Sequence, residues 1–246
     1  MTVQEFLIQF SGVLTVQSRL KPTDIAGLFG WWKADAGTYE DTSLTTPASA
    51  DADPVGGLWD WSGNGNHLTQ STSTKRPALK LAIQNGLPVL RFDGVDDFLA
   101  GAFGAAQSQP YTLLFAFSLR TVAAQKSVCD GKDATHRCQL ITFPDASTWD
   151  FYAGGADTNA GTPDAAWHAL GIRVNGAASK VRFDGGADTT VSPGTQGVSG
   201  ITLGTAYDGT SAGAVDVGES LAYSGAVSDA NLISLMSYLK GRWGTP

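Results

Sequence analysis

The sequence is short of charge, and the charge that it carries is mostly negative. Only 16% of its 246 residues are Asp, Glu, Lys or Arg, against about 25% in an average domain. The formal net charge is −7, and Lys and Arg form no cluster. Neutralisation of nucleic-acid phosphates is therefore not expected, and an anionic membrane surface is a disfavoured partner as well.

Long apolar runs are also missing. No window reaches the about 18 uninterrupted apolar residues of a transmembrane helix, so membrane insertion is not expected. The first ten residues make a poor secretory signal, because they lack a basic start, carry Glu5, and break their apolar run at Gln9. We therefore expect synthesis in a cytoplasm without a signal peptide, with secretion as the alternative.

Glutamate is rare, which bears on catalysis. Glu5, Glu40 and Glu219 are widely separated, whereas hydrolysis of a glycosidic bond needs two carboxyls across one sugar. Asp96 and Asp97 are adjacent and would point to opposite sides of a strand. The sequence contains no His-Glu-x-x-His and no Gly-x-Ser-x-Gly, so we predict no catalytic residues and no enzyme.

The chain has two cysteines, Cys129 and Cys138, which flank the turn-like run 130–133. They could face each other across a hairpin, so a disulfide is possible. The alternative is a pair of small buried or free thiols, because a core of this size needs no bridge. Their spacing matches no zinc-binding motif.

Glycine, with 30 copies, and ten prolines indicate many short strands and turns. Residues 111–119 are nearly continuously apolar and rich in β-formers, which predicts the most buried strand of the protein. Further strands are predicted at 87–92, 126–129 paired with 139–143, 149–153, 167–174, 179–183, 201–203 and 215–223.

One helix is predicted near the C-terminus. Ser228 is a good N-cap and Asp229 suits the first turn. An apolar stripe at helical spacing follows, and Gly241 is expected to end the helix. The stripe consists of Leu232, Leu235, Met236 and Leu239.

The run from 59 to 99 carries a family resemblance. It opens with WDWSGNGNH at 59–67, where dense Gly and Asn indicate backbone at positive φ. It closes with NGLPVLRFDGVDDFL at 85–99, in which Asp93-Gly94 is a hairpin-type turn signal. With GWWKAD at 30–35 and YLKGRWG at 238–244, these motifs resemble the laminin-G-like or concanavalin-A-like jelly-roll domains, common in bacteriophage virion proteins and secreted bacterial proteins.

The resemblance implies an all-β fold, an antiparallel β-sandwich with a short C-terminal helix, over residues 28–246. Residues 1–27 lie outside it and are expected to form an arm that docks on other virion proteins or on a neighbouring subunit, or else a first strand or helix packed on its own domain. The function expected is that of a non-enzymatic, homo-oligomeric virion structural protein, a head decoration, head fibre or tail-associated adhesion module with weak affinity for a host glycan. The alternatives are a secreted carbohydrate-binding lectin and, less favoured, a glycan hydrolase.

Carbohydrate sites present a flat aromatic ring to the apolar face of a sugar, with polar groups nearby for its hydroxyls. The candidates are the aromatics Trp149, Tyr152, Trp167 and Tyr207 and the polar residues Asp150, Asn159 and Arg173. Each aromatic could instead be a core residue. Trp149 and Tyr152 are separated by an odd step, so they cannot both face one side of a regular strand.

A calcium site is the one cofactor site that the residues suggest. Asp93, Asp96 and Asp97, with Asn64 and Asn66, could offer the hard oxygen ligands that calcium prefers. The alternative is that these Asp and Asn residues are turn formers.

Overall fold

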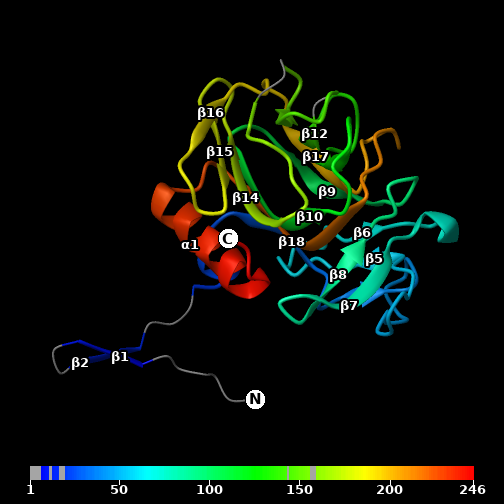
Figure 1. The fold of residues 1–246 in the computed structure, drawn as a ribbon, viewed down its shortest axis with the longest axis horizontal. Helices are drawn as coiled ribbons and strands as arrows, with labels where there is room; N and C mark the ends of the chain where they lie inside the picture. Colours follow the sequence, from blue (N-terminus) through cyan, green and yellow to red (C-terminus); the bar gives the residue numbers. More distant parts are fainter. Residues whose placement is uncertain (1–6, 11–12, 17–19, 143, 156–158) are drawn as a thin grey trace.

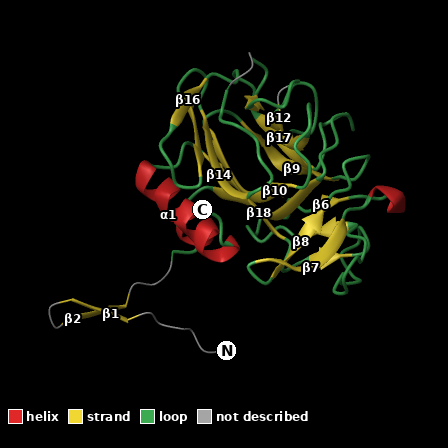
Figure 2. Cartoon of the chain, viewed as in Figure 1, coloured by secondary structure: helices red, strands yellow, loops and turns green. Residues whose placement is uncertain are grey.

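The computed structural model describes residues 7–10, 13–16, 20–142, 144–155 and 159–246. Two antiparallel sheets of eight strands each lie face to face, and one helix crosses the outer face of one sheet (Figure 1; Figure 2). The predicted fold class, an antiparallel β-sandwich with a C-terminal helix, is confirmed.

Sheet I has the strand order β16-β15-β14-β10-β18-β8-β7, with β3 also paired to β18. Its strands are β3 (Leu28–Lys33), β7 (Ala78–Gln84), β8 (Leu87–Arg91), β10 (Tyr111–Leu119), β14 (Trp167–Val174), β15 (Ser179–Phe183), β16 (Thr189–Val191) and β18 (Val215–Ser224). All nine residues of β10 are buried, because its Phe115 side packs between the sheets and its Leu114 side packs under the helix. The strand predicted to be the most buried is therefore confirmed.

Sheet II has the strand order β13-β12-β11-β17-β9-β6-β5-β4. Its strands are β4 (Thr38–Tyr39), β5 (Gly57–Leu58), β6 (Leu68–Thr69), β9 (Leu99–Gln107), β11 (Ser127–Asp130), β12 (Gln139–Thr142), β13 (Trp149–Tyr152) and β17 (Val198–Leu203). The chain also contains two short 3-10 helices, η1 (Pro22–Asp24) before β3 and η2 (Ser73–Lys75) before β7. The predicted pairing of β11 with β12 is confirmed.

The turn signal at Asp93-Gly94 does not close a hairpin. The strand before it, β8, pairs with β7 and β18 in sheet I, whereas the strand after it, β9, pairs with β17 and β6 in sheet II. Phe92 and Leu99, on either side of the turn, are both fully buried in the core between the sheets. The turn therefore carries the chain from one sheet to the other.

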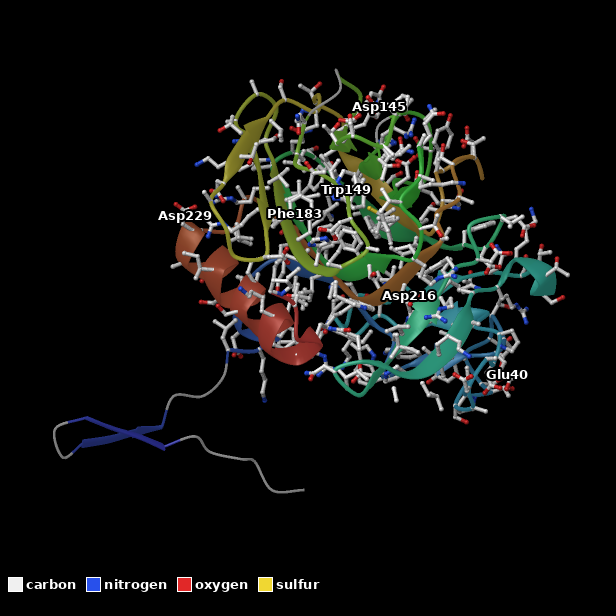
Figure 3. The ribbon with its side chains drawn as sticks, viewed as in Figure 1. Glu40, Asp145, Trp149, Phe183, Asp216 and Asp229 are labelled. Atoms are coloured by element: carbon white, nitrogen blue, oxygen red, sulfur yellow. The ribbon has the colours of Figure 1, made fainter. Side chains whose placement is uncertain are left out.

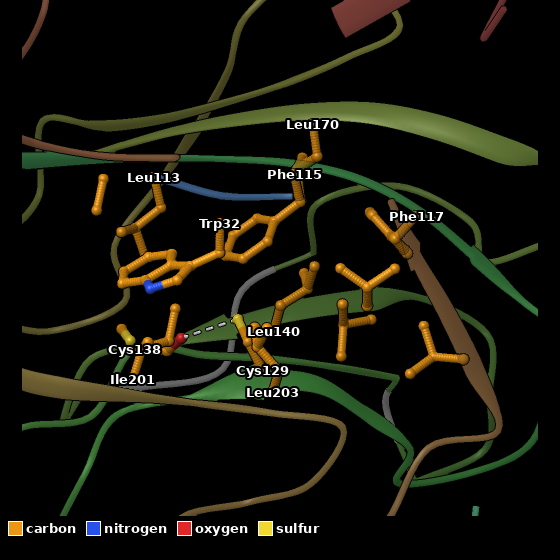
Figure 4. Packing of buried hydrophobic residues seen from close by; sticks show 14 of the residues in the cluster. Trp32, Leu113, Phe115, Phe117, Cys129, Cys138, Leu140, Leu170, Ile201 and Leu203 are labelled. Carbon is orange, nitrogen blue, oxygen red and sulfur yellow. Dashed lines mark hydrogen bonds between the residues drawn. The ribbon is translucent and has the colours of Figure 1, made fainter. Parts of the chain in front are cut away.

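The core between the sheets holds both cysteines (Figure 4). Cys129 and Cys138 are free and buried, and the Cys129 thiol donates a weak hydrogen bond to the Cys138 carbonyl at 3.6 Å. The structure thus contains thiols where a disulfide was possible. Trp32 reaches the same core, while its neighbour Trp31 packs toward the helix on the opposite face of sheet I.

Helix α1 (Asp229–Trp243) begins as predicted, with the Ser228 hydroxyl accepting the Asn231 N–H at 3.2 Å. It does not end at Gly241 but continues to Trp243 and stops at Gly244, whose φ is 61°. Trp243 is fully buried, and burying this ring outweighs the about 1 kcal/mol that a glycine costs inside a helix. No helix within the described ranges is long and apolar enough to cross a membrane.

A buried carboxylate on β18 joins the helix to sheet I. Glu219 is fully buried and accepts hydrogen bonds from Trp31 Nε1 at 2.6 Å, Tyr238 Oη at 2.8 Å and Trp243 Nε1 at 2.9 Å. The Arg242 guanidinium lies 2.9 Å from it. The rare glutamate that looks isolated in the sequence is thus the centre of a polar network under α1.

Strands β1 (Leu7–Phe10) and β2 (Val13–Val16) form a two-stranded sheet of their own, apart from sheets I and II (Figure 1). Pro22 and Ile25, which fall in the predicted arm, pack against the sandwich: both are buried, and Tyr223 Oη donates to the Pro22 carbonyl at 2.9 Å. Docking of the arm on another protein stays a prediction, and residues 1–6, 11–12 and 17–19 lie outside the described ranges.

Candidate functional site

The outer face of sheet II, away from the core, carries a polar surface where β11, β12 and β13 lie side by side. Alternation along each strand places Leu140 and Phe151 in the core and their neighbours outside. The register then sets the outward residues opposite one another in two pairs. These pairs are Gln139 with Tyr152 and Ile141 with Asp150.

A hollow of about 330 Å³ lies over this face, which is within the range of small-molecule sites, about 300–1,000 Å³. We call it the Arg137 hollow. Its lining includes Gln125, Arg137, Gln139, Ile141, Asp150 and Tyr152.

Arg137, two residues before the start of strand β12, organises the hollow. Its guanidinium lies over the Tyr152 and Tyr207 rings, 5.2 and 4.6 Å from their centroids. Its Nε and Nη2 lie 2.8 and 2.7 Å from Asp130 Oδ2, and Nη2 also donates to Gln139 Oε1 at 2.6 Å. One side chain therefore fixes groups from three strands and from the loop after β17.

Asp130 lies beneath Arg137 and is fully buried. Burial raises the pKa of Asp130 above its usual value, even though Arg137 acts to lower it. The carboxylate also accepts the backbone N–H groups of Gly131 at 2.6 Å and Tyr207 at 3.1 Å. With its oxygens engaged in this way, Asp130 positions Arg137 and the Tyr207 loop rather than facing the hollow.

A sugar has an apolar face and polar hydroxyl groups, and the region of the hollow offers a partner for each. Tyr152 and Tyr207 are half-buried, and their rings offer flat apolar faces beside Arg137. The amide of Gln139 and the carboxylate of Asp150 add hydrogen-bonding groups around the hollow.

Two of the seven predicted carbohydrate residues, Tyr152 and Asp150, line the hollow, and a third, Tyr207, lies next to it against Arg137. Trp149 does not, because it is only 1% exposed and lies between the sheets. Its ring packs against Phe117 at 5.4 Å and Phe183 at 6.2 Å (Figure 3). The odd step from Trp149 to Tyr152 thus places one ring in the core and the other at the surface.

The remaining three lie elsewhere. Trp167 stacks on Trp243 of the helix, 5.9 Å between centroids and 7° between planes. Arg173 is buried on sheet I and pairs with Asp188 and Asp229. Asn159 is exposed, and its side chain accepts the N–H of a nearby turn glycine.

Sequence reasoning missed Arg137, Gln139 and Asp130. The signal available was the alternation of Arg137 and Gln139 with the apolar Cys138 and Leu140, which predicts a strand with one polar face. What the sequence does not contain is the register that sets Gln139 opposite Tyr152.

The predicted calcium residues divide into two groups. The carboxylates of Asp93, Asp96 and Asp97 offer oxygens within 4.8 Å of one another in the loop between β8 and β9. Asp93 Oδ1 accepts the Val95 N–H at 2.8 Å, and Asp97 Oδ2 accepts the Asp93 N–H at 3.0 Å. Burial raises the pKa of Asp97 to about 6. These contacts are those of turn formers, and the three oxygens are at the same time close enough to share one cation.

Asn64 and Asn66 belong to a different turn. The Asn66 side chain donates to the Phe29 carbonyl at 2.6 Å, and the Asn64 side chain donates to the Leu28 carbonyl at 3.1 Å. Both asparagines therefore hold the 62–66 turn against β3.

No family model and no curated protein matches the sequence. Solved structures match it in fold. Domain 4 of AbnA, a GH43 extracellular arabinanase from Geobacillus stearothermophilus in complex with arabinotriose, has a TM-score of 0.59 and 15% identity, over 85% of this chain and 98% of that one. An arabinofuranosidase complexed with arabinofuranosyl-alpha-1,2-xylobiose has a TM-score of 0.57 and 15% identity, over 77% of this chain and 51% of that one. The Trypanosoma rangeli sialidase in complex with sialic acid has a TM-score of 0.52 and 12% identity, over 89% of this chain and 34% of that one.

These comparisons correct two predictions. Several of the proteins that share the fold are glycoside hydrolases, a receptor binding domain is another, and none of these is described as part of a phage particle, so the prediction of a virion structural protein is contradicted. The prediction that the chain is no enzyme is contradicted for the same reason. At these low identities the similarity establishes the fold itself: the chain has the β-sandwich found in proteins that carry glycans in their solved complexes.

Proposed function

We propose that the chain is a carbohydrate-binding domain and that the Arg137 hollow takes a short stretch of a glycan. The observation that carries the proposal is the placement of two half-buried tyrosine rings around one arginine, beside a hollow of about 330 Å³. A sugar ring has an apolar face of C–H groups and a polar edge of hydroxyls. The tyrosines match the face, and the polar lining matches the edge.

Arg137 keeps donors for a ligand. Its Nε and Nη2 are engaged by Asp130 and Gln139, whereas within the described part of the chain no hydrogen bond engages Nη1. Two N–H groups of a rigidly held guanidinium are therefore available to hydroxyl oxygens. Holding the arginine in place before binding reduces the entropy that a ligand contact would otherwise cost.

The charge of the protein favours a neutral glycan. At a net charge of −7, a polyanionic chain would be repelled at long range. Because fold neighbours were solved with arabinotriose and with an arabinofuranosyl xylobiose, arabino- and xylo-oligosaccharides are the first ligands to test.

Calorimetric titration with these oligosaccharides tests the proposal. We expect Tyr152→Ala and Tyr207→Ala each to lower the affinity about tenfold, which corresponds to about 1.4 kcal/mol and to the upper range for an aromatic stacking contact. Tyr39→Ala is the matched control, since Tyr39 is also half-buried but lies on β4 at the other end of sheet II. Equal affinity in all three folded variants would refute the assignment of the hollow.

The same oligosaccharides serve for an activity assay. Release of reducing sugar by the wild type, lost in Asp150→Asn, would make the hollow a catalytic site and Asp150 a group acting on the glycosidic bond. Binding without release would leave the hollow as a binding site for the glycans tested.

A further inference from the structure

Two tryptophans are displayed to solvent away from the hollow. Trp59 is 38% exposed and Trp61 is 42% exposed, and they are the aromatic residues among the exposed large apolar side chains of the described chain. They directly follow β5, whereas the hollow lies over β12 and β13 at the opposite end of the strand order of sheet II. Six strand spacings separate β5 from β13, which is about 29 Å along a flat sheet.

The backbone sets the two indoles on the same side. The Trp59 N–H donates to the Gly37 carbonyl and the Trp61 N–H to the Trp31 carbonyl, both at 2.7 Å, so residues 59–61 are fixed beside β3 and the residues after it. Both tryptophans lie against the same residue, Gly37, which places their side chains next to each other. Asp60 between them points the other way, is 2% exposed, and accepts the Trp31 N–H at 2.9 Å.

Asp60 holds the following turn as well. Its second oxygen accepts the Ser62 hydroxyl at 2.8 Å and the Asn66 N–H at 2.9 Å. The Asn66 side-chain oxygen in turn accepts the Gly104 N–H of β9 at 3.0 Å. The turn that presents the tryptophans is therefore fixed to the sandwich at several points.

The rings are supported from behind. Trp59 lies on the His67 imidazole, 4.1 Å between centroids, and the Lys33 ammonium lies 4.5 Å from the Trp61 ring centre. Gly37, at φ +78°, forms the floor: a Cβ there would come within 2.6 Å of Trp59 Cβ and 2.9 Å of Trp61 Nε1. The two indoles thus form a preorganised surface, which we call the Trp59–Trp61 platform.

We propose that the Trp59–Trp61 platform is a second glycan-binding surface, which stacks on successive rings of a neutral linear polysaccharide. The proposal rests on the proposed function for the class of its ligand, but on separate residues for its site. An oligosaccharide of two or three units is shorter than the distance to the hollow, whereas one long chain or an insoluble fibre can engage both surfaces and bind more tightly through them.

The size of the platform favours a sugar over a protein. At about 40% exposure, the two indoles together present roughly 120–200 Å², taken from the 150–250 Å² of an aromatic side chain. A stable protein interface needs about 800 Å² from each partner. The next residues, 62–65, are Ser, Gly, Asn and Gly, three of them exposed, so the apolar surface does not continue into the adjoining turn.

The test compares soluble and insoluble ligands. Trp59→Ala/Trp61→Ala and Tyr152→Ala are each measured by calorimetry with a short oligosaccharide and by depletion from solution onto an insoluble polysaccharide, arabinan or xylan. We expect the double tryptophan variant to keep its affinity for the oligosaccharide and to lose at least tenfold on the insoluble polymer. Ile233→Ala, at a 50% exposed apolar residue of α1 on the other sheet, is the control and should bind both like the wild type.

The outcomes separate the two proposals. Unchanged binding of the double variant to the insoluble polymer would overturn the platform and leave the hollow standing. Loss in the double variant with normal binding by Tyr152→Ala would support the platform and remove the hollow. A concentration-dependent dimer that the double variant abolishes, with polymer binding unchanged, would show that the platform binds a second copy and would overturn the proposal.

A measurement on the wild type covers the case of variants that do not fold. N-bromosuccinimide oxidises exposed indoles, and peptide mass spectrometry locates the products. The insoluble polymer should protect Trp59 and Trp61 from oxidation at least fivefold. Equal oxidation with and without polymer would overturn the proposal.

Discussion

Replacing Glu219 by Gln tests the network that holds α1 to sheet I. Glu219 is fully buried and faces three donors at 2.6–2.9 Å, the side chains of Trp31, Tyr238 and Trp243. Glutamine has nearly the same shape, but one of its two acceptor oxygens becomes an NH₂ group. That group would face either the Trp243 indole or the Trp31 and Tyr238 donors, so at least one buried donor loses its acceptor.

The expected cost follows from these contacts. One unsatisfied buried donor costs about 1–3 kcal/mol, and breaking a buried charge pair by removing one partner costs about 3–5 kcal/mol. Arg242 is not fully buried, with its side chain 25% exposed, and it keeps Asp35 as a second partner, so the low end applies. We therefore expect a loss of about 3 kcal/mol, which lowers the melting temperature by about 6–12 °C in a chain of this length.

Thermal and urea unfolding of Glu219→Gln against Glu40→Gln measures this difference. Glu40 carries the same chemistry at the periphery (Figure 3), and its hydrogen bonds to Thr46 and Arg76 use its backbone. The control should stay within about 0.5 kcal/mol of the wild type. A melting temperature of Glu219→Gln within 2 °C of the control would mean that the carboxylate does not hold the helix, and the reasoning would fail.

Three further predictions concern other regions. Burial raises the pKa of Asp97 to about 6 from 3.8, so the folded state binds more protons than the unfolded state between these pH values, and stability falls as the pH rises through this window. Asp97→Asn should therefore be about 1–3 kcal/mol more stable than the wild type in urea unfolding at pH 7.5 and differ little from it at pH 4. Heat on calcium titration that is seen with the wild type and not with Asp97→Asn would establish the cation site. Gly241 is exposed inside α1 and Gly244 ends it at φ 61°, so Gly241→Ala should stabilise by about 0.5–1 kcal/mol and Gly244→Ala should destabilise by about 1–2 kcal/mol, an ordering that urea midpoints check. Burial raises the pKa of both Cys129 and Cys138, so Ellman's reagent should label two thiols after unfolding and almost none in the native protein; rapid native labelling would contradict their burial.

The fold could be predicted where one residue pattern admits one explanation. The unbroken apolar run of β10 required cover on both faces, and the structure supplies sheet II on one face and α1 on the other. The adjacent Trp31 and Trp32 required two different environments, and they face the helix and the core. In both cases neighbouring residues of a strand point to opposite faces of the sheet, so the position in the sequence predicts the face.

Predictions that rested on a single turn-forming or helix-ending residue were less accurate. Asp93-Gly94 forms a turn, but a turn signal cannot tell a hairpin from a passage between sheets, and the burial of Phe92 and Leu99 on opposite sheets decides the matter. Gly241 does not end α1, because tertiary burial of Trp243 outweighs a local preference. Single Gly and Asp residues indicate where a turn or a helix end can form, and the burial of neighbouring side chains determines which structure forms there.

In the candidate site, the alternation along one strand could be predicted from the sequence, whereas the pairing between strands could not. Parity alone places Asp150 and Tyr152 together and excludes Trp149, since even steps along β13 share a face. Their partners come from elsewhere: Gln139 through the pairing of β12 with β13, and Tyr207 through a loop that Asp130 fastens by its backbone. A single sequence contains neither the register nor the loop path, so Tyr152 and Asp150 could be assigned to one face from the sequence, whereas Arg137 and Gln139 could not be assigned to the same site.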